Sequence, residues 1–396
     1  MMQINIISIL LFIISPFLAL PTILYGVVKK NKTSIVLFII LFSFLSYLFI
    51  PNYSDDKSRY IEMYEGYRDW GYIKFILYYL SISQDFILQT FIKIAAEIGV
   101  KPQIVFFTIT SVVFSIIFMI WRKMSLILQF TQTQATVSLL LAVTSVSLLD
   151  LFSGTRFMLG AAVMLFAYFQ GFIINKRWYP YIWLIIAVNI HFSLLVFMII
   201  YLFVKIFNRY PVIVKIFFII SFCFLIIPKE FLSNILKTIG LGGALGAKGG
   251  SYTDSDDFLD NYFKEAGSAG LIIYFCQMLW IFMMYIYLFL HIKTTKYHHL
   301  MIFSVVAVMN IFFSTTTIYM RYSLFVKLIF VIVLFVDIKE YKLKKIPILF
   351  IIAFIIILIT QFIIARYNID KSYTKESFFL WDILNQRPVT SNDLIY

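Results

Sequence analysis

The sequence PQIVFFTITSVVFSIIFMIW occupies residues 102–121 and is followed at once by Arg122 and Lys123. A helix of about twenty apolar residues has the length needed to cross the ~30 Å hydrocarbon core of a membrane. Similar runs fill most of the chain, since 62% of its 396 residues are hydrophobic and only 13% are charged. The runs are continuously apolar rather than alternating, which indicates helices and excludes a β-barrel.

The predicted fold class is therefore all-α: a polytopic integral membrane protein with about 11–12 transmembrane helices, forming one domain over residues 1–396. We expect the first run to be a retained span, because it is too long for a signal-peptide core and no basic segment precedes it. The candidate spans are 4–28, 33–50, 102–121, 134–151, 155–174, 179–206, 211–227, 268–290, 300–318, 320–336 and 346–364.

The distribution of charge between these runs predicts the orientation. One set of short loops carries 16 Lys and Arg but only two acids, Asp337 and Glu340, whereas the opposite side carries 18 of the 20 acidic residues. The positive-inside rule places the basic set in the cytoplasm, and both chain ends, including the tail 365–396, then lie outside. The net charge of +13 is explained in this way and does not indicate nucleic-acid binding. The basic loops are 29–32, 122–123, 176–177, 205–215, 293–296 and 339–345.

The run 179–206 begins and ends on the predicted cytoplasmic side, and it is long for one span and short for two. We interpret it as a broken hairpin of two half-crossings that meet near Asn189-Ile190-His191. Such a hairpin is tolerated where it is buried in protein or lines a wet cavity. The alternative is that this run crosses the membrane once and that the count of spans is wrong elsewhere in the chain.

Two large external loops interrupt the spans. The loop 51–101 contains two stretches, 71–81 and 85–98, that are apolar on one face and are predicted to be interfacial helices at the headgroups. The loop 228–267 is rich in glycine over residues 240–250, which predicts a mobile segment. It suits a substrate lid or a plain linker equally well.

Ionisable groups near the membrane are the first candidates for function, because each costs roughly 2.5–3.5 kcal/mol to insert. Arg156 and Arg321 lie at predicted outer ends of spans, and His191 lies at the proposed hairpin tip. A guanidinium binds phosphate oxygens in a bidentate manner and keeps its charge, so the two arginines suit a diphosphate. Helix anchoring by snorkelling is the alternative for the arginines, and a satisfied core histidine is the alternative for His191.

A second polar group opens the loop 51–101. Asp55, Asp56, Arg59 and Tyr60 combine carboxylate, guanidinium and phenol, with Asp56 and Tyr60 on one face of a helix at i, i+4. These groups suit a sugar site, in which a carboxylate accepts a proton from an attacking hydroxyl. Ion pairs on a solvated surface are the alternative.

The sequence indicates neither a metal site nor a cofactor site. It contains no P-loop, GxGxxG or GxSxG motif. Cys223 and Cys276 lie in apolar runs and are expected to be buried small hydrophobes. His298 and His299 are adjacent, and neighbouring side chains on a helix diverge, so we expect no metal pair there.

These landmarks together resemble the EpsG/Wzy group of bacterial polysaccharide polymerases, with matches scattered from about residue 51 to 335. The Asp-x-x-x-Tyr motif after the second span is similar to Asp56–Tyr60, and the Arg that opens a span before small residues is similar to Arg156 with 160–162. The Ala-x-x-Ile-His-x-Ser motif is similar to 187–193, and the late Arg-Tyr is similar to Arg321-Tyr322.

The resemblance implies a fold of the broad glycosyltransferase C type and a metal-independent glycosyltransferase without a cofactor. Such a polymerase joins undecaprenyl-diphosphate-linked oligosaccharide units at the outer, periplasmic face of the bacterial inner membrane, beside membrane lipids and a chain-length regulator protein. Arg156 and Arg321 would bind diphosphate, His191 would support them, and Asp56 would be the base, with Asp55 as the alternative. Arg59, Tyr60 and Tyr322 would contact sugar.

Other functions are open on the sequence. An O-antigen ligase would use the same donor but transfer the glycan to a lipid core. A flippase or transporter for lipid-linked oligosaccharides would show matched halves and a midplane site, which the sequence does not show. A non-catalytic scaffold and an acyltransferase are further alternatives, although the His-x4-Asp spacing of acyltransferases does not occur.

Overall fold

The computed structural model describes residues 2–82, 86–228, 267–340, 345–374 and 377–395. These ranges are mostly helical, and extended backbone pairs within them only at an isolated bridge between Asn52 and Ile395. The prediction of an all-α fold is therefore confirmed. The α-helices are α1 (Met2–Ile14), α2 (Leu20–Val28), α3 (Lys32–Leu48), α4 (Asp56–Tyr67), α5 (Tyr72–Ile82), α6 (Ile87–Ile98), α7 (Pro102–Ile127), α8 (Gln132–Thr144), α9 (Leu148–Phe152), α10 (Thr155–Tyr168), α11 (Tyr179–Ile190), α12 (Leu195–Phe207), α13 (Pro211–Ser221), α17 (Gly267–Leu290), α18 (Tyr297–Ile311), α19 (Thr316–Glu340), α20 (Lys345–Ile364), α21 (Arg366–Ser372) and α22 (Leu380–Asn385).

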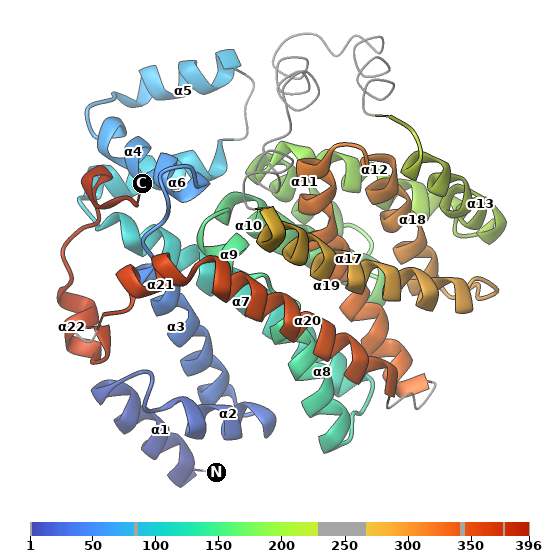
Figure 1. Ribbon diagram of the computed structural model, residues 1–396, viewed down its shortest axis with the longest axis horizontal. Helices are drawn as coiled ribbons and strands as arrows, with labels where there is room; N and C mark the ends of the chain where they lie inside the picture. The colour runs from blue at the N-terminus through green and yellow to red at the C-terminus, as the bar shows by residue number, and fades with distance from the viewer. Residues whose placement is uncertain (1, 83–85, 229–266, 341–344, 375–376, 396) are drawn as a thin grey trace.

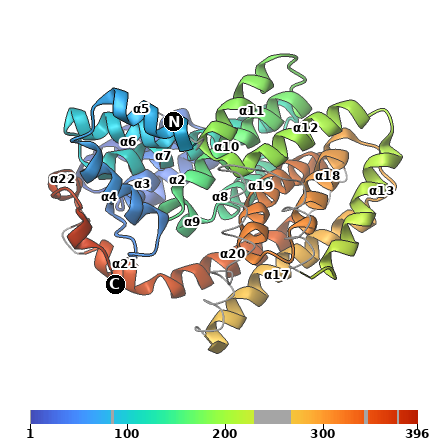
Figure 2. The same ribbon diagram turned by 90° about the horizontal axis from the view of Figure 1, so that it is seen from above.

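The helices form two groups around a central layer. In Figures 1 and 2, α1 to α7 and the tail helices α21 and α22 lie at one end of the molecule, and α12, α13, α17 and α18 lie at the other. The central helix is α10, which packs against α7, α11 and α19 and is buried throughout from Phe157 to Tyr168. Small side chains at Gly160, Ala161 and Ala162 permit this close packing. Its first turn carries Arg156.

Three described segments are long and apolar enough to cross a membrane, namely Pro102–Ile127, Thr155–Ile173 and Ile346–Ile364. The second of these is α10 extended by a π-helical turn, Phe169–Ile173. Seven further apolar helices of 10–17 residues accompany them among the described residues. The chain is thus a helical membrane protein, although several predicted spans are divided.

The prediction of a single span over 4–28 is wrong. The run is divided into α1 and α2 by a turn at residues 15–19, and Asn31 Nδ2 donates to Asn5 Oδ1 at 2.7 Å, so the start and end of the run lie together. The N-terminal residues therefore lie beside the 29–32 loop rather than on the opposite side. Pro16 explains the break, because it lacks an N–H donor and disfavours helical backbone at Ser15. The Ser15 hydroxyl donates instead to Phe378 O at 2.6 Å.

The predicted break in 179–206 is present. Helix α11 ends at Ile190, His191 has extended backbone (φ −147°, ψ 109°), and a 3₁₀ turn at Phe192–Leu194 leads into α12. The rings of Tyr181 and Tyr201, each ten residues from His191, lie 5.8 Å apart. The two arms therefore fold back alongside each other, with His191 at the tip.

The external loop 51–101 and the C-terminal tail form one assembly. The predicted interfacial stretches 71–81 and 85–98 correspond to α5 and α6. Their position at the lipid headgroups stays a prediction. Buried Lys93 on α6 donates to Tyr67 O at 2.9 Å, which fixes α6 against α4, and it pairs with Glu97 on its own helix at 2.6 Å. The tail covers this loop, since Lys101 Nζ donates to Leu384 O at 2.9 Å and Ile395 N to Pro51 O at 3.2 Å.

Loops that the charge count assigns to the cytoplasm also contact each other. Lys339 Nζ donates to Gln129 O at 3.4 Å, and Lys215 Nζ donates to Lys293 O at 3.1 Å. These contacts agree with the relative grouping of the loops. Which group faces the cytoplasm stays a prediction from the positive-inside rule.

Two further boundaries differ from the predicted ones. The run 134–151 is divided into α8 and α9 at residues 145–147, and α19 begins at Thr316, so Arg321 lies more than one turn inside its helix rather than at the start. The glycine-rich part of the loop 228–267 lies outside the described residues.

Candidate active site

Asp55 and Asp56 lie where the chain leaves α3 and enters α4. Asp55 precedes the helix with extended backbone, and its Oδ2 accepts the N–H of Asn52 at 2.9 Å. Burial raises the pKa of Asp55 to about 6, and the hydrogen bond from Asn52 opposes part of this rise. Asp55 therefore changes charge near neutral pH while it is held by its own loop.

Asp56 joins two of the predicted site residues. Its Oδ1 lies 3.6 Å from Arg59 Nη1, and its Oδ2 lies 3.9 Å from Arg321 Nη2. The side chains of Asp56 and Arg321 are 20% and 33% exposed, so the pair is half enclosed but reachable. The contact connects the external helix α4 to α19, which lies far away in the sequence. It brings a carboxylate and a guanidinium together at one site.

Lys57 is a buried cation that the sequence reasoning missed. Its Nζ donates to Ser46 O and Phe49 O, both at 2.7 Å, and lies 4.6 Å from the ring centre of Phe106. Burial lowers the pKa of Lys57 to about 7, and the negative charge of Asp55 opposes this. The side chain fixes the start of α4 against the end of α3, and so positions Asp56.

Arg156 lies one residue inside α10, next to the start of α4. The carbonyl of Ser153, three residues earlier, accepts the N–H of Lys57 at 2.9 Å. Tyr79 on α5 lies near enough to interact electrostatically with the Arg156 guanidinium. The start of α4 and Tyr79 of α5 therefore lie near the first turn of α10. Arg156, which is predicted to bind the diphosphate, lies partly buried there.

The hairpin tip lies beside the same turn of α10. The His191 ring stands perpendicular to Phe157, with ring centres 5.3 Å apart, and its Nδ1 is 2.8 Å from Ser193 Oγ. Gly160 makes this approach possible, because a Cβ there would lie 3.3 Å from His191 Cβ. His191 is thus at the level of Arg156, as the order of the sequence motifs suggests.

Tyr322 connects α19 to the hairpin tip. Its hydroxyl donates to Ser193 O at 3.0 Å, so the helix that carries Arg321 is attached to the turn that carries His191. The rings of Tyr60 and Tyr322 are buried in the packed interior and present no open face to a sugar, whereas the Arg59 side chain is 63% exposed. Among the three predicted sugar contacts, the placement favours Arg59.

Asp150 and Lys327 are two further charged residues that the sequence reasoning missed. Asp150 on α9 interacts electrostatically with Lys327 and Arg321 on α19, and Lys327 is buried with its Nζ 5.5 Å from the ring centre of Phe354. Both residues stand inside apolar runs. The rule that charges within spans have a role therefore applies to them as much as to Arg156.

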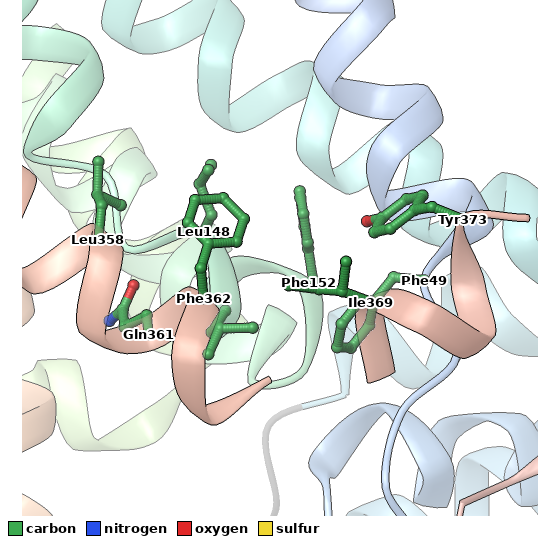
Figure 3. Close-up of a pocket in the computed structure, with 9 residues that line it drawn as sticks. Phe49, Leu148, Phe152, Leu358, Gln361, Phe362, Ile369 and Tyr373 are labelled. Atoms are coloured by element: carbon green, nitrogen blue, oxygen red, sulfur yellow. The ribbon is translucent and has the colours of Figure 1, made fainter. Parts of the chain in front are cut away.

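A small apolar groove lies beside the segments that carry the charged residues, although none of those residues lines it. It lies between α9, the C-terminal half of α20 and α21 (Figure 3). Phe49, whose carbonyl binds Lys57, forms part of its wall, and α9 supplies Asp150 to the charged site. Gln361 at its edge donates to Ser147 Oγ at 2.7 Å. The lining residues are Phe49, Leu148, Leu149, Phe152, Leu358, Gln361, Phe362, Ile369 and Tyr373.

The residues of this site provide fixed positive charge, titratable carboxyl groups and an adjoining apolar surface. Arginine binds phosphate oxygens directly, and a carboxylate accepts a hydroxyl proton. Within the described residues, one group has the ligand chemistry of a metal site, His291, His299 and Asp337, and it lies at the other end of α19.

The chain matches the model of the EpsG family over residues 35–378. This range includes every candidate residue from Asp55 to Tyr322. No curated protein and no solved structure matches the chain.

Proposed function

Because the chain belongs to the EpsG family, we propose that it joins oligosaccharide repeat units carried on undecaprenyl diphosphate. Family membership indicates a polysaccharide polymerase-like enzyme in a membrane. The proposal adds the lipid diphosphate donor, transfer without a metal ion, and an outward-facing site in the bacterial inner membrane. The contact between Asp56 and Arg321 supports it, because the contact brings a carboxylate and a guanidinium together from distant parts of the chain.

In the proposed reaction, a sugar hydroxyl of the incoming unit attacks the anomeric carbon of the growing chain. The new glycosidic C–O bond forms as the bond from that carbon to the diphosphate oxygen breaks. The hydroxyl proton passes to the carboxylate of Asp56, and undecaprenyl diphosphate leaves with the bonding electron pair. The energy comes from the glycosyl diphosphate, so the reaction needs no nucleotide.

Arg156 and Arg321 bind the two phosphates in this proposal. Their fixed charge stabilises the negative charge that develops on the leaving oxygen, and one such contact contributes about 2.7–4 kcal/mol. His191 supports them from the hairpin tip, where Ser193 and Phe157 fix its ring. Arg59, exposed beside Asp56, contacts the sugar of the acceptor.

The apolar groove suits the isoprenoid chain of the carrier. It lies beside Phe49 and α9, which also carry groups next to the charged residues, so part of the isoprenoid chain would pack there along α20. Binding energy from the isoprenoid chain, which takes no part in the reaction, would position the reacting end.

The test is complementation of a host that lacks the gene and makes the polymer. Arg156→Gln, Arg321→Gln and Asp56→Asn are each expected to reduce polymer formation by about 100-fold or more. The single lipid-linked unit should accumulate, and mass spectrometry of extracted lipids would detect it. Arg68→Gln is the matched control, since Arg68 is an exposed arginine at the end of α4.

Wild-type chain lengths in both Arg156→Gln and Arg321→Gln would refute the diphosphate assignment. A polymerase variant should still leave single units on the final acceptor. Loss of single units from that acceptor as well, with a normal lipid-linked pool, would instead identify a ligase.

A further inference from the structure

Three of the four histidines in the chain surround one carboxylate, far from the candidate active site. His298 and His299 lie in the first turn of α18, His291 follows the end of α17, and Asp337 lies near the end of α19. His299 is fully buried, and His298 and Asp337 are at least nine-tenths buried. Asp337 is sixteen residues after Arg321 on one helix, about 24 Å away.

The distances among these groups approach those of a metal site. His299 Nε2 lies 3.2 Å from Asp337 Oδ2, and His298 Nε2 lies 3.4 Å from Asp337 Oδ1. The edge of a zinc tetrahedron with bonds of 2.0–2.1 Å is about 3.3 Å. One ligand atom each from His291, His299 and Asp337 lies within 4.8 Å of the others, so small side-chain rotations would bring all three onto one ion.

The hydrogen bonds around the group leave ligand atoms pointing inward. Within the described protein, His298 Nε2, His299 Nε2 and Asp337 Oδ1 are buried and contact one another only at 3.2–3.4 Å across the imidazole–carboxylate pairs, and His299 Nδ1 is buried without a hydrogen-bond partner. A buried polar atom without a full partner destabilises the fold unless something satisfies it. Three imidazole nitrogens gathered at one carboxylate, with one lone pair on each neutral ring, form a set of donors that suits a cation.

The surrounding contacts have the character of a second coordination shell. His291 Nδ1 is 2.8 Å from Tyr287 O and donates to it, which leaves the lone pair on Nε2. The Tyr287 hydroxyl donates to the Asp337 carboxylate. The N-terminal turn of α18 also disfavours positively charged imidazole at His298 and His299, and so favours the neutral form that binds metals.

We propose that His291, His299 and Asp337 bind one divalent zinc ion that ties together the ends of α17, α18 and α19, with His298 beside Asp337 as the neighbouring imidazole. Imidazole nitrogen with carboxylate oxygen is a ligand set that suits zinc. The ion is structural, because it lies at the opposite end of α19 from the proposed reaction. It would fix the helix that carries Arg321 against its two neighbours.

The test uses the full chain purified in detergent from cells grown with added zinc. Elemental analysis by mass spectrometry should find about one zinc ion per chain. His291→Gln, His299→Gln and Asp337→Asn should each retain a tenth of this or less, whereas His191→Gln, which changes the remaining histidine, should retain the wild-type amount. Metal-stripped wild type titrated with Co²⁺ should give the visible absorption of four-coordinate cobalt.

The wild-type measurements do not depend on the folding of any variant. Zinc below a tenth of an ion per chain, together with no cobalt absorption, would overturn the site. Thermal unfolding tests the structural role: stripped protein should unfold at a lower temperature, and added Zn²⁺ but not Mg²⁺ should restore it. An unchanged unfolding temperature after complete stripping would overturn that role.

Discussion

Gly160→Ala should reduce polymer formation because it displaces the hairpin tip. A Cβ at Gly160 would lie 2.6 Å from Leu194 Cδ1, 3.3 Å from His191 Cβ and 3.5 Å from Ala187 O. Ordinary carbon contacts are about 3.5–4.0 Å, so the Leu194 methyl must move by about 1 Å. Leu194 is fully buried and His191 nearly so, and both belong to the 191–194 turn. The added methyl therefore pushes the 191–194 turn away from α10.

Two opposing effects set the loss of stability. Alanine in place of glycine stabilises a helix by about 0.5–1 kcal/mol, whereas overpacking a core costs about 1–3 kcal/mol. The net destabilisation should be about 0–2.5 kcal/mol, so most of the protein still folds. The activity should fall further, by about 10- to 100-fold, because a shift of about 1 Å in a positioning group has effects of this size.

The assay measures polymer formation in the complemented host. This value is divided by the amount of folded protein, which is determined by size-exclusion chromatography. Gly171→Ala is the matched control, since a Cβ there would lie 1.9 Å from Tyr201 Oη at the other end of the same helical segment. It should lower stability but leave activity per folded molecule nearly unchanged. Leu194→Ala added to Gly160→Ala should recover part of the activity. Activity of Gly160→Ala within about twofold of wild type would refute the role of the His191 turn.

Three further predictions concern charge and the groove. Because the pKa of Asp55 is raised to about 6, the folded protein keeps a proton that the unfolded chain has lost. Stability should therefore fall by at most about 3 kcal/mol as the pH rises from about 4 to 6. In Asp55→Asn, the unfolding temperature should depend less on pH over this range. Lys327→Met should cost at most about 3–5 kcal/mol, because Asp150 keeps only its interaction with Arg321, and adding Asp150→Asn should recover most of this loss if the two residues interact. Leu358→Trp, which fills the groove, should raise the apparent KM for the lipid-linked substrate several-fold but leave that for a short-chain analogue unchanged; an equal effect on both would exclude the groove as the lipid site.

The candidate site could be predicted from the sequence because charge is rare in this chain and costly within it. Arg156, His191 and Arg321 stand out against apolar neighbours, and the structure attaches their three segments to one another through Phe157 and Ser193. The same reasoning applied to Asp150 and Lys327 would have found them. Lys57 gave no such signal, since it stands among other charges in a loop and is buried only by the later folding of α3 and α7 around it.

Helix boundaries and clusters of residues distant in the chain could not be predicted from the sequence. Hydropathy sums do not register that a helix turns back, so the effect of Pro16 on the first run was missed. The histidine cluster depends on three elements that meet only in the fold, and adjacent His298 and His299 both face Asp337 because they lie in the first turn of α18.

The weakness of the Asp56–Arg321 contact fits the proposed reaction. A half-exposed ion pair at 3.9 Å contributes only about 0–1 kcal/mol, so it holds the two side chains near each other without fixing them. A diphosphate carries more charge than a carboxylate and offers Arg321 bidentate contacts, so it should replace Asp56 as the partner of that arginine. The Asp56 carboxylate would then be released from Arg321 and free to accept a hydrogen bond from the attacking hydroxyl when the donor is bound. Binding of the donor would in this way prepare the base that accepts the hydroxyl proton. It follows that Asp56→Asn should weaken turnover much more than binding of undecaprenyl diphosphate, whereas Arg321→Gln should weaken both.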